Sequence, residues 1–277
     1  MVWKALSRYP TLIFLAGVTG MPSVGIFFAE SALGQTARST QLYRSQLVVP
    51  TQVSQAIDTD WNQFQPPTVG VPGRREGGGT RGSASCQTGA SKLVALIPAS
   101  TSGRTSLEQP TLLFYLPVAF DQVPADLEIA DEEENVVYKT SLKISNRQPG
   151  VIKLDLADQP NAPTLEADRD YHWYLTLRCS ADSPDASSNI TVHGWINRVQ
   201  LDSAQAQTLE QASPEEKLAI YSEKALWYDA LATLAKLRAS NPSDPTVESQ
   251  WSELLEAVGL DRLVQEPIVT SQAVPEN

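Results

Sequence analysis

Residues 171–179 read YHWYLTLRC, and this alternation of residue types is typical of a β-strand with one buried face. Successive side chains of a strand point to opposite sides of the sheet. One face therefore carries Tyr171, Trp173, Leu175, Leu177 and Cys179. We expect this face to lie in a core, whereas His172, Tyr174, Thr176 and Arg178 face outward.

Further strand patterns surround this stretch at regular spacing. They cover residues 93–97, 112–116, 127–129, 136–140, 152–156 and 189–199. About seven strands without intervening helices predict an antiparallel β-sandwich over residues 83–200, immunoglobulin-like in type. Gly194 within the last strand indicates a bulge or a close approach of another chain segment.

One hairpin in this region has an acidic tip. Asp131 to Glu134 separate the patterns at 127–129 and 136–140. Four consecutive carboxylates suggest calcium as an alternative, but the ligand spacing of an EF-hand loop is absent. We expect a solvated turn.

The sequence changes to a helical period after Leu201. Ser213 to Glu216 form a capping box, from which helical sequence continues to Ala239. A further helix begins at Asp244-Pro245 and ends at Gly259. These signals predict a small bundle of three to four helices over residues 201–266, followed by a disordered tail over residues 267–277. The whole chain is thus α+β, with the two classes of element in separate parts.

The N-terminal residues predict export. Residues 1–34 combine a basic start, an apolar run and small residues before Gln35, as in a signal peptide. An uncleaved membrane anchor is the alternative, because the apolar run has about the length of a span. The mature chain has no other such run, so we expect a periplasmic or extracellular protein without a membrane span.

Residues 35–82 are rich in Gln, Pro and Gly and predict a flexible tether. Gly77, Gly79 and Gly82 within it have the G-x-G-x-x-G spacing of dinucleotide-binding loops. Such a loop needs a buried strand before it and a helix N-terminus after it, and the sequence predicts neither. A glycine hinge before the first strand explains the pattern better.

The net charge bears on the class of partner, and the two cysteines bear on a covalent crosslink within the chain. The net charge of −11 disfavours binding to nucleic acid. Cys86 and Cys179 are the only cysteines, and an even count in an exported chain indicates one disulfide, with two free thiols as the alternative.

Candidate site residues are few. His172 and His193 are the only histidines, which excludes a multi-histidine zinc site, and no sequence motif supplies a nucleophile beside them. They meet if their strands pair, with Asp170 or Arg178 as candidate partners. We predict no catalytic residue, no metal and no cofactor.

Aromatic residues provide the candidate binding surfaces. Tyr174 and Trp195 lie on predicted strands and suit a carbohydrate or envelope polymer if they are exposed. Trp227, Tyr228 and Trp251 lie on predicted helices, where they line a groove or pack in the core. Both interpretations stay open at this point.

Several stretches, taken in order, resemble an uncharacterised family found largely in cyanobacteria, domain-of-unknown-function family 928. They are Gly73 to Arg75, Gly78 to Gly82, Cys86, Pro110-Thr111, Phe114 to Pro117, Tyr171 to Tyr174, Cys179, Gly194 to Ile196, Trp227 to Leu231, Trp251, Leu254-Leu255 and Val258 to Leu260. The resemblance covers about residues 73–267 and implies export and a layout of strands followed by helices. It brings no catalytic residues. The family more often has glycine near Ala225 or Leu226, where a helix would break, whereas this sequence predicts that the helix runs through.

These patterns together predict a non-enzymatic interaction or scaffold module of the cell envelope with a protein partner. A carbohydrate-binding or envelope-polymer-binding module is the main alternative. A hydrolase that uses His172 or His193 is a further one.

Overall fold

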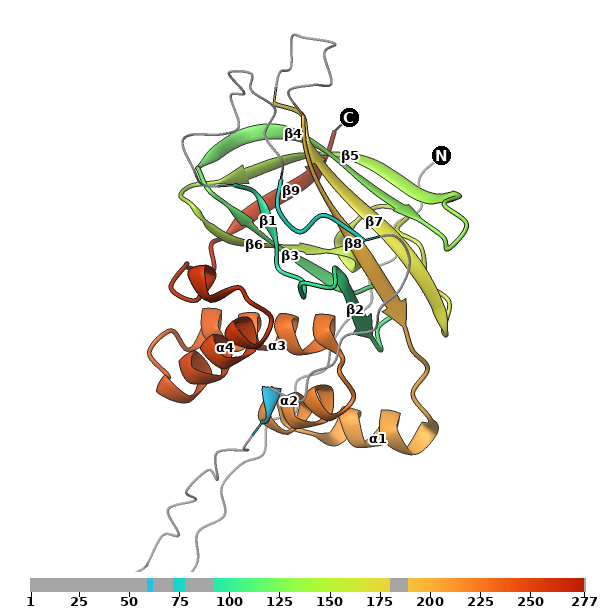
Figure 1. The fold of residues 1–277 in the computed structure, drawn as a ribbon, viewed down its shortest axis with the longest axis vertical. Coiled ribbons are helices and arrows are strands. Elements are labelled where there is room, and N and C mark those ends of the chain that lie inside the picture. The colour runs from blue at the N-terminus through green and yellow to red at the C-terminus, as the bar shows by residue number, and fades with distance from the viewer. Residues whose placement is uncertain (1–58, 62–71, 78–91, 180–188, 277) are drawn as a thin grey trace, which may run out of the picture. The chain divides into compact units, whose positions relative to one another are not determined.

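The computed structural model describes residues 59–61, 72–77, 92–179 and 189–276. All of them belong to the unit that spans Val53–Asn277. Its strands and helices are coloured in chain order in Figure 1. The strands before the helices are β1 (Val94–Ala95), β2 (Ser102–Thr105), β3 (Thr111–Leu116), β4 (Phe120–Ala130), β5 (Val136–Asn146), β6 (Gly150–Asp155), β7 (Arg169–Leu177) and β8 (Ile190–Arg198).

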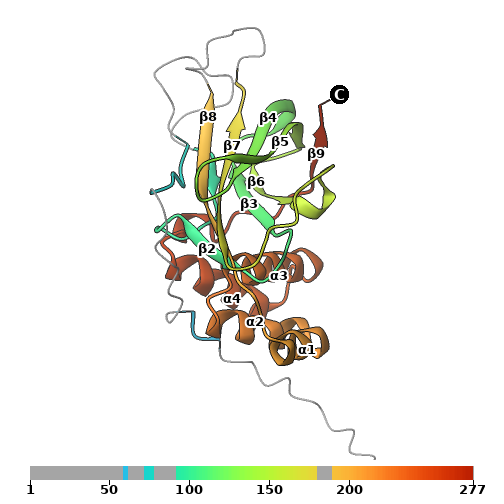
Figure 2. The same ribbon diagram turned by 90° about the vertical axis from the view of Figure 1, so that its right-hand side faces the viewer.

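Four helices and one more strand follow. They are α1 (Ser203–Gln211), α2 (Pro214–Glu223), α3 (Trp227–Ser240), α4 (Pro245–Ala257) and β9 (Ser271–Pro275). The order of elements confirms the predicted α+β class, with helices after the main block of strands. Figures 1 and 2 show the four helices together at one end of the strands.

The strands form two sheets that share one core. The smaller sheet has the order β1-β3-β6, and the larger has the order β2-β8-β7-β4-β5-β9. Most neighbours are antiparallel, but β2 runs parallel to β8. Phe114 of the smaller sheet meets Trp173 of the larger sheet edge to face, with ring centroids 5.5 Å apart. The apolar face predicted for residues 171–179 is buried as expected.

Gly194 on β8 is a site of close approach, as its sequence position predicted. A Cβ atom there would lie 2.6 Å from Ile97 Cδ1 and 2.8 Å from the carbonyl oxygen of Thr101. Both distances are shorter than carbon atoms tolerate, so only glycine lets this part of β8 contact the chain before β2.

The helical region differs from its prediction at one point. The capping box at Ser213 forms as expected, with hydrogen bonds between Ser213 and Glu216 in both directions. However, the predicted continuous helix breaks between α2 and α3, where Ala225 adopts a φ of 53°. Leu226, Trp227 and Tyr228 can then turn into the core, where each is almost fully buried. Burial of these side chains outweighs the helix-forming tendency of the local sequence.

Two predicted boundaries were wrong. The tail expected to be disordered from residue 267 contains β9, which pairs antiparallel with β5. The tether expected over residues 35–82 includes residues that pack into the fold, since Trp61 is 2% exposed and Arg74 and Glu76 form β-bridges. Residues 74–76 and β9 are polar, and backbone partners elsewhere in the chain hold them in place. Within the described ranges, no helix has the length and apolarity needed to cross a bilayer.

Candidate functional site

The two histidines meet on the face of the larger sheet opposite Trp173. β7 and β8 pair so that Tyr174 lies opposite His193, and His172 lies opposite Trp195. The ring nitrogens His172 Nε2 and His193 Nδ1 are 2.9 Å apart. The conditional expectation that these side chains meet if their strands pair is therefore confirmed.

Glu134 completes this cluster. Its carboxylate oxygens lie 2.7 Å from His172 Nδ1 and 3.0 Å from the Tyr174 hydroxyl, which donates to it. The hydrogen bond from His172 lowers the pKa of Glu134. We call Glu134, His172, Tyr174, His193 and Trp195 the histidine cluster.

The turn between β4 and β5 positions Glu134. Asp131 accepts hydrogen bonds from the backbone amides of Glu133 and Asn135, at 3.0 and 2.8 Å. Glu134 itself has a φ of 62°, a left-handed conformation that directs its side chain back over β7. The acidic tip is a turn, as predicted, but one of its carboxylates belongs to the histidine cluster.

The cluster forms a chain of hydrogen bonds from Glu134 to His193. An ionised Glu134 only accepts, so a neutral His172 donates to it from Nδ1, and its Nε2 accepts a hydrogen bond from the Nδ1–H of His193. Burial is the main reason that the pKa of His193 lies below its usual 6.5, and the charges of His172 and Arg74 add to this effect. The arrangement can relay a proton between Glu134 and His193 through His172.

The predicted exposure of His172 and its predicted partners were wrong. His172 is 2% exposed because it lies under the rings around it. Asp170 accepts instead from Asn197, at 2.7 Å, and Arg178 pairs with Asp126 and Glu276. The sequence contained a signal for Glu134, since a hairpin next to β7 brings its tip near the start of that strand.

The strand aromatics do not form an open platform. Trp195 is 3% exposed and stacks on His172, with centroids 4.2 Å apart and planes 16° from parallel. Tyr174 is partly exposed and stacks on His193. Burial and the hydrogen bond to Glu134 raise the pKa of Tyr174 to about 12. The expectation of a sugar-stacking surface on Trp195 does not agree with this burial.

The helix aromatics pack in the core. Trp227, Tyr228 and Trp251 are each at most 1% exposed. The Trp227 indole donates to the Leu96 carbonyl oxygen at 2.9 Å, and the guanidinium of Arg238 lies 5.2 Å from the Trp251 ring centroid. Of the two interpretations left open, core packing is therefore the correct one, and these three side chains line no surface groove.

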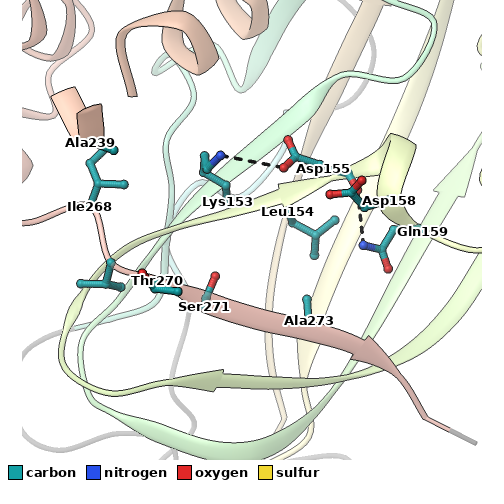
Figure 3. A pocket seen from close by; sticks show the side chains of 11 residues that line it. Lys153, Leu154, Asp155, Asp158, Gln159, Ala239, Ile268, Thr270, Ser271 and Ala273 are labelled. Carbon is teal, nitrogen blue, oxygen red and sulfur yellow. Dashed lines mark hydrogen bonds and ion pairs between the residues drawn. The ribbon is translucent and has the colours of Figure 1, made fainter. Parts of the chain in front are cut away.

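A polar groove lies between β6 and β9, two strands at the edges of different sheets. It has a volume of about 330 Å³. Figure 3 shows Lys153, Asp155 and Gln159 on one side and Thr270 and Ser271 along the other. The sequence does not predict this groove, because its pattern at residues 267–277 indicates a disordered tail.

Gln159 is the most unusual residue of the groove. Its side-chain amide donates to the carbonyl oxygen of Asp155 at 3.3 Å. Its Oε1 atom is buried and has no hydrogen-bond partner among the described residues, although Gln159 is 7% exposed. Lys153 and Asp155 approach each other to 4.0 Å at the mouth of the groove. A buried acceptor without a donor is costly to the fold and marks a place where a donor would be stabilised.

Some sequence predictions remain outside this description. Cys179 is buried, but Cys86 lies in a range that the structure does not describe, so their disulfide stays a prediction. Gly79 and Gly82 also lie outside, whereas Gly77 donates its amide to the Leu93 carbonyl oxygen at 2.8 Å, a role in the β-structure. Within the described residues, no group of three or more His, Cys, Asp or Glu side chains can hold a metal ion.

Comparison with protein families agrees with the resemblance. The family model described as Domain of Unknown Function (DUF928) matches residues 76–268. The chain belongs to this family. The matched range begins at the bridging segment around Glu76, includes the histidine cluster and the four helices, and ends just before β9. No curated protein and no solved structure matches the chain.

Proposed function

We propose that this member of the DUF928 family is an exported, non-enzymatic interaction module of the cell envelope, and that it binds a protein partner. The observation that carries this proposal is the edge of the larger sheet at β9, which pairs with no further strand among the described residues and borders the polar groove. An open strand edge presents unpaired peptide groups to which another chain can bind. The export of the protein is supported by the signal-like residues 1–34.

The proposal includes the architecture of the strand region. The contact between Phe114 and Trp173 supports a sandwich of the two sheets. The immunoglobulin-like topology stays a prediction. The parallel pairing of β2 with β8 differs from the purely antiparallel sandwich that the sequence predicted.

A crosslinked pull-down of the tagged chain from the envelope of its own host tests the function. Mass spectrometry and glycan analysis are applied to the same eluate. A protein that is recovered reproducibly supports the proposal. Recovery of a glycan without protein favours the envelope-polymer alternative, and a chain that captures nothing contradicts both.

Hydrolysis is the second candidate, and the histidine cluster favours it. The contact of Glu134 with His172, and of His172 with His193, resembles the acid-to-base relay of hydrolytic sites, although no nucleophile belongs to the cluster. The wild-type chain and the His172→Ala and His193→Ala variants are assayed with a panel of ester, amide and glycoside substrates. Turnover by the wild-type chain that is lost in both variants would support a hydrolase. Absence of turnover in the wild-type chain, or equal turnover in the variants, would remove it.

A further inference from the structure

The two sheets are joined on one side by a short extended segment, residues 74–77. The amide and carbonyl of Arg74 exchange hydrogen bonds with those of His193 on β8, each at 2.9 Å. The Ala95 amide on β1 donates to the Arg75 carbonyl oxygen at 2.8 Å. Residues 74–77 thus connect the larger sheet to the smaller one through backbone hydrogen bonds.

On the other side, β6 pairs with the chain that leads into β9 at one described residue, Val151. The Val151 amide on β6 donates to the carbonyl oxygen of Pro267 at 2.8 Å, and Val151 accepts from the Val269 amide at 2.9 Å. The bridge between Val151 and Ile268 is parallel. Beyond it the chain leaves β6 and pairs with β5 as β9, and the groove of about 330 Å³ opens between the two strands.

The peptide groups of β6 turn toward this groove. Because Val151 uses both its amide and its carbonyl on the groove side, the alternation of an antiparallel ladder directs those of Lys153 the same way. The pairing of β3 supports this direction. Leu113 lies opposite Lys153, and its carbonyl oxygen accepts a hydrogen bond from the Leu96 amide on the β1 side, so it does not pair with Lys153. Among the described residues, the backbone groups of Lys153 have no partner.

The peptide groups of β9 also turn toward the groove. The Glu276 amide donates to the Ser141 carbonyl oxygen at 2.8 Å, which fixes the ladder between β5 and β9. By alternation, Ser271 and Ala273 direct their amides and carbonyls away from β5. Pro275 occupies the next such position and has no amide to offer, so the open part of the edge ends there.

The side chains of the groove indicate what would fill it. The buried Oε1 of Gln159 has no hydrogen-bond donor among the described residues. Asp155 and Asp158 outnumber Lys153 among the charged lining residues, so the groove favours a positive charge. Since β6 and the chain entering β9 run in the same direction, one strand between them can run antiparallel to both, the better pairing geometry.

We propose that the groove binds an extended segment of a partner protein, which enters as a strand between β6 and β9 and carries a lysine or arginine opposite Asp155 and Asp158. The partner's segment then joins the two sheets at the groove, as residues 74–77 of this chain join them on the other side. This inference rests on the proposed function, because it names the surface and the kind of partner that an interaction module would use.

A displayed library of short random peptides, selected against the full chain, tests the inference. Selected peptides are synthesised, and their dissociation constants are measured for the wild-type chain and for Ala273→Pro, which removes an amide directed into the groove. We expect affinity to fall about tenfold or more, because one backbone hydrogen bond is lost and its acceptor is left unpaired. Val274→Ala is the matched control, since this side chain is 48% exposed and its backbone groups pair with β5.

Two further measurements make the result independent of folding. Thermal unfolding of Ala273→Pro must match that of the wild-type chain, and Ser271→Pro serves as a second variant if it does not. Amide hydrogen exchange at Lys153 and Ala273 should slow when a selected peptide is bound. We also expect the selected peptides to be enriched in basic residues.

Several outcomes would overturn the inference. They are a selection that yields no binder, binders that are unaffected by both proline variants, and dimerisation of the chain itself that the proline variants abolish. A partner from the envelope pull-down that binds Ala273→Pro as well as wild type would overturn the inference and leave the proposed function standing. A pull-down that captures nothing would count against the function itself.

Discussion

The indole Nε1 of Trp173 donates to the hydroxyl of Tyr228 at 2.9 Å, and this hydroxyl donates in turn to the carbonyl oxygen of Trp195 at 2.9 Å. One side chain from α3 therefore satisfies polar groups from both β7 and β8. All of these atoms are buried. The hydrogen bonds tie the helical region to the centre of the larger sheet.

Tyr228→Phe should lower the free energy of unfolding by about 1 to 3 kcal/mol, because it leaves the buried indole N–H of Trp173 without its acceptor. Urea denaturation measures the loss. The same substitution in a Trp173→Phe background should cost less, since the donor is already absent. Equal costs in the two backgrounds would show that the Trp173 hydrogen bond contributes nothing.

Ala225 should tolerate glycine better than any other alanine of the helical region. Its φ of 53° strains every residue with a Cβ, most of all β-branched residues. We expect Ala225→Gly to raise the free energy of unfolding by about 0.5 kcal/mol, and Ala225→Val to lower it by about 2 kcal/mol. Ala206→Gly, at an exposed position within α1, is the control and should cost about 1 kcal/mol. If both glycine variants lose stability equally, the left-handed break is absent.

Acidification should destabilise the protein through His193. Its pKa is lowered in the folded state, so the unfolded state binds more protons as the pH falls. The stability that His193 contributes is thus fully present above its usual pKa of 6.5 and is lost below it. Glu134, with a lowered pKa, acts in the same direction around and below its usual value of 4.5.

Chemical denaturation from about pH 8 to about pH 3 separates these groups. The charged or titratable groups that face His193 are His172, Arg74 and Glu134, with Tyr174 stacked on its ring. His193→Gln should flatten the curve below pH 6.5 and leave the drop at lower pH. An unchanged slope in this variant would assign the effect to another group.

Arg75 should be sensitive to a conservative change. Its guanidinium donates to the carbonyl oxygens of Val258 at 2.8 Å, Gly259 at 3.1 Å and Ile97 at 3.3 Å, which links the bridging segment to the end of α4. Lysine cannot span these acceptors, so Arg75→Lys should cost about 1 to 2 kcal/mol in urea denaturation. The neighbouring Arg74 is exposed, and Arg74→Lys should change stability by less than about 0.5 kcal/mol. Similar values for both would argue against the link.

The predicted disulfide has a direct chemical test. In the denatured chain without reductant, a thiol reagent should label neither Cys86 nor Cys179, and after reduction it should label both. Reduction should also lower the free energy of unfolding by about 4 kcal/mol, because a loop of about ninety residues is released. Labelling before reduction would favour the alternative of two free thiols.

The sequence was most informative wherever burial follows a local period. The alternation in residues 171–179 identified the buried face of β7 correctly, and the residues between 127–129 and 136–140 form the hairpin turn as expected. The caps at Ser213 and Asp244, and the positive φ of Gly259, also agree with local signals. These features depend on neighbours within a few positions of the chain, which is the range that a pattern of residue types records.

The partners and the burial of the site residues depend on chain segments that are far apart in the sequence. The sequence indicates that His172 and His193 can meet, but its pattern favours Asp170 or Arg178 as their partners and places His172 at the surface. The left-handed conformation of Glu134 and the stacking of Trp195 bury His172 instead. Neither feature has a periodic signal, because each arises where a turn and two strands come together.

By itself, the sequence determined most of the strands, though neither β2 nor β9, and it determined which faces are apolar and where several helices begin and end. Only the tertiary structure decided that Ala225 breaks a helix, that residues 74–77 bridge two sheets, and that Ser271–Pro275 form a strand whose edge borders a groove. The reason is that local periodicity records burial of an element's own face. The pairing of a polar backbone with a strand more than a hundred residues away depends on free peptide groups that only the assembled sheets present.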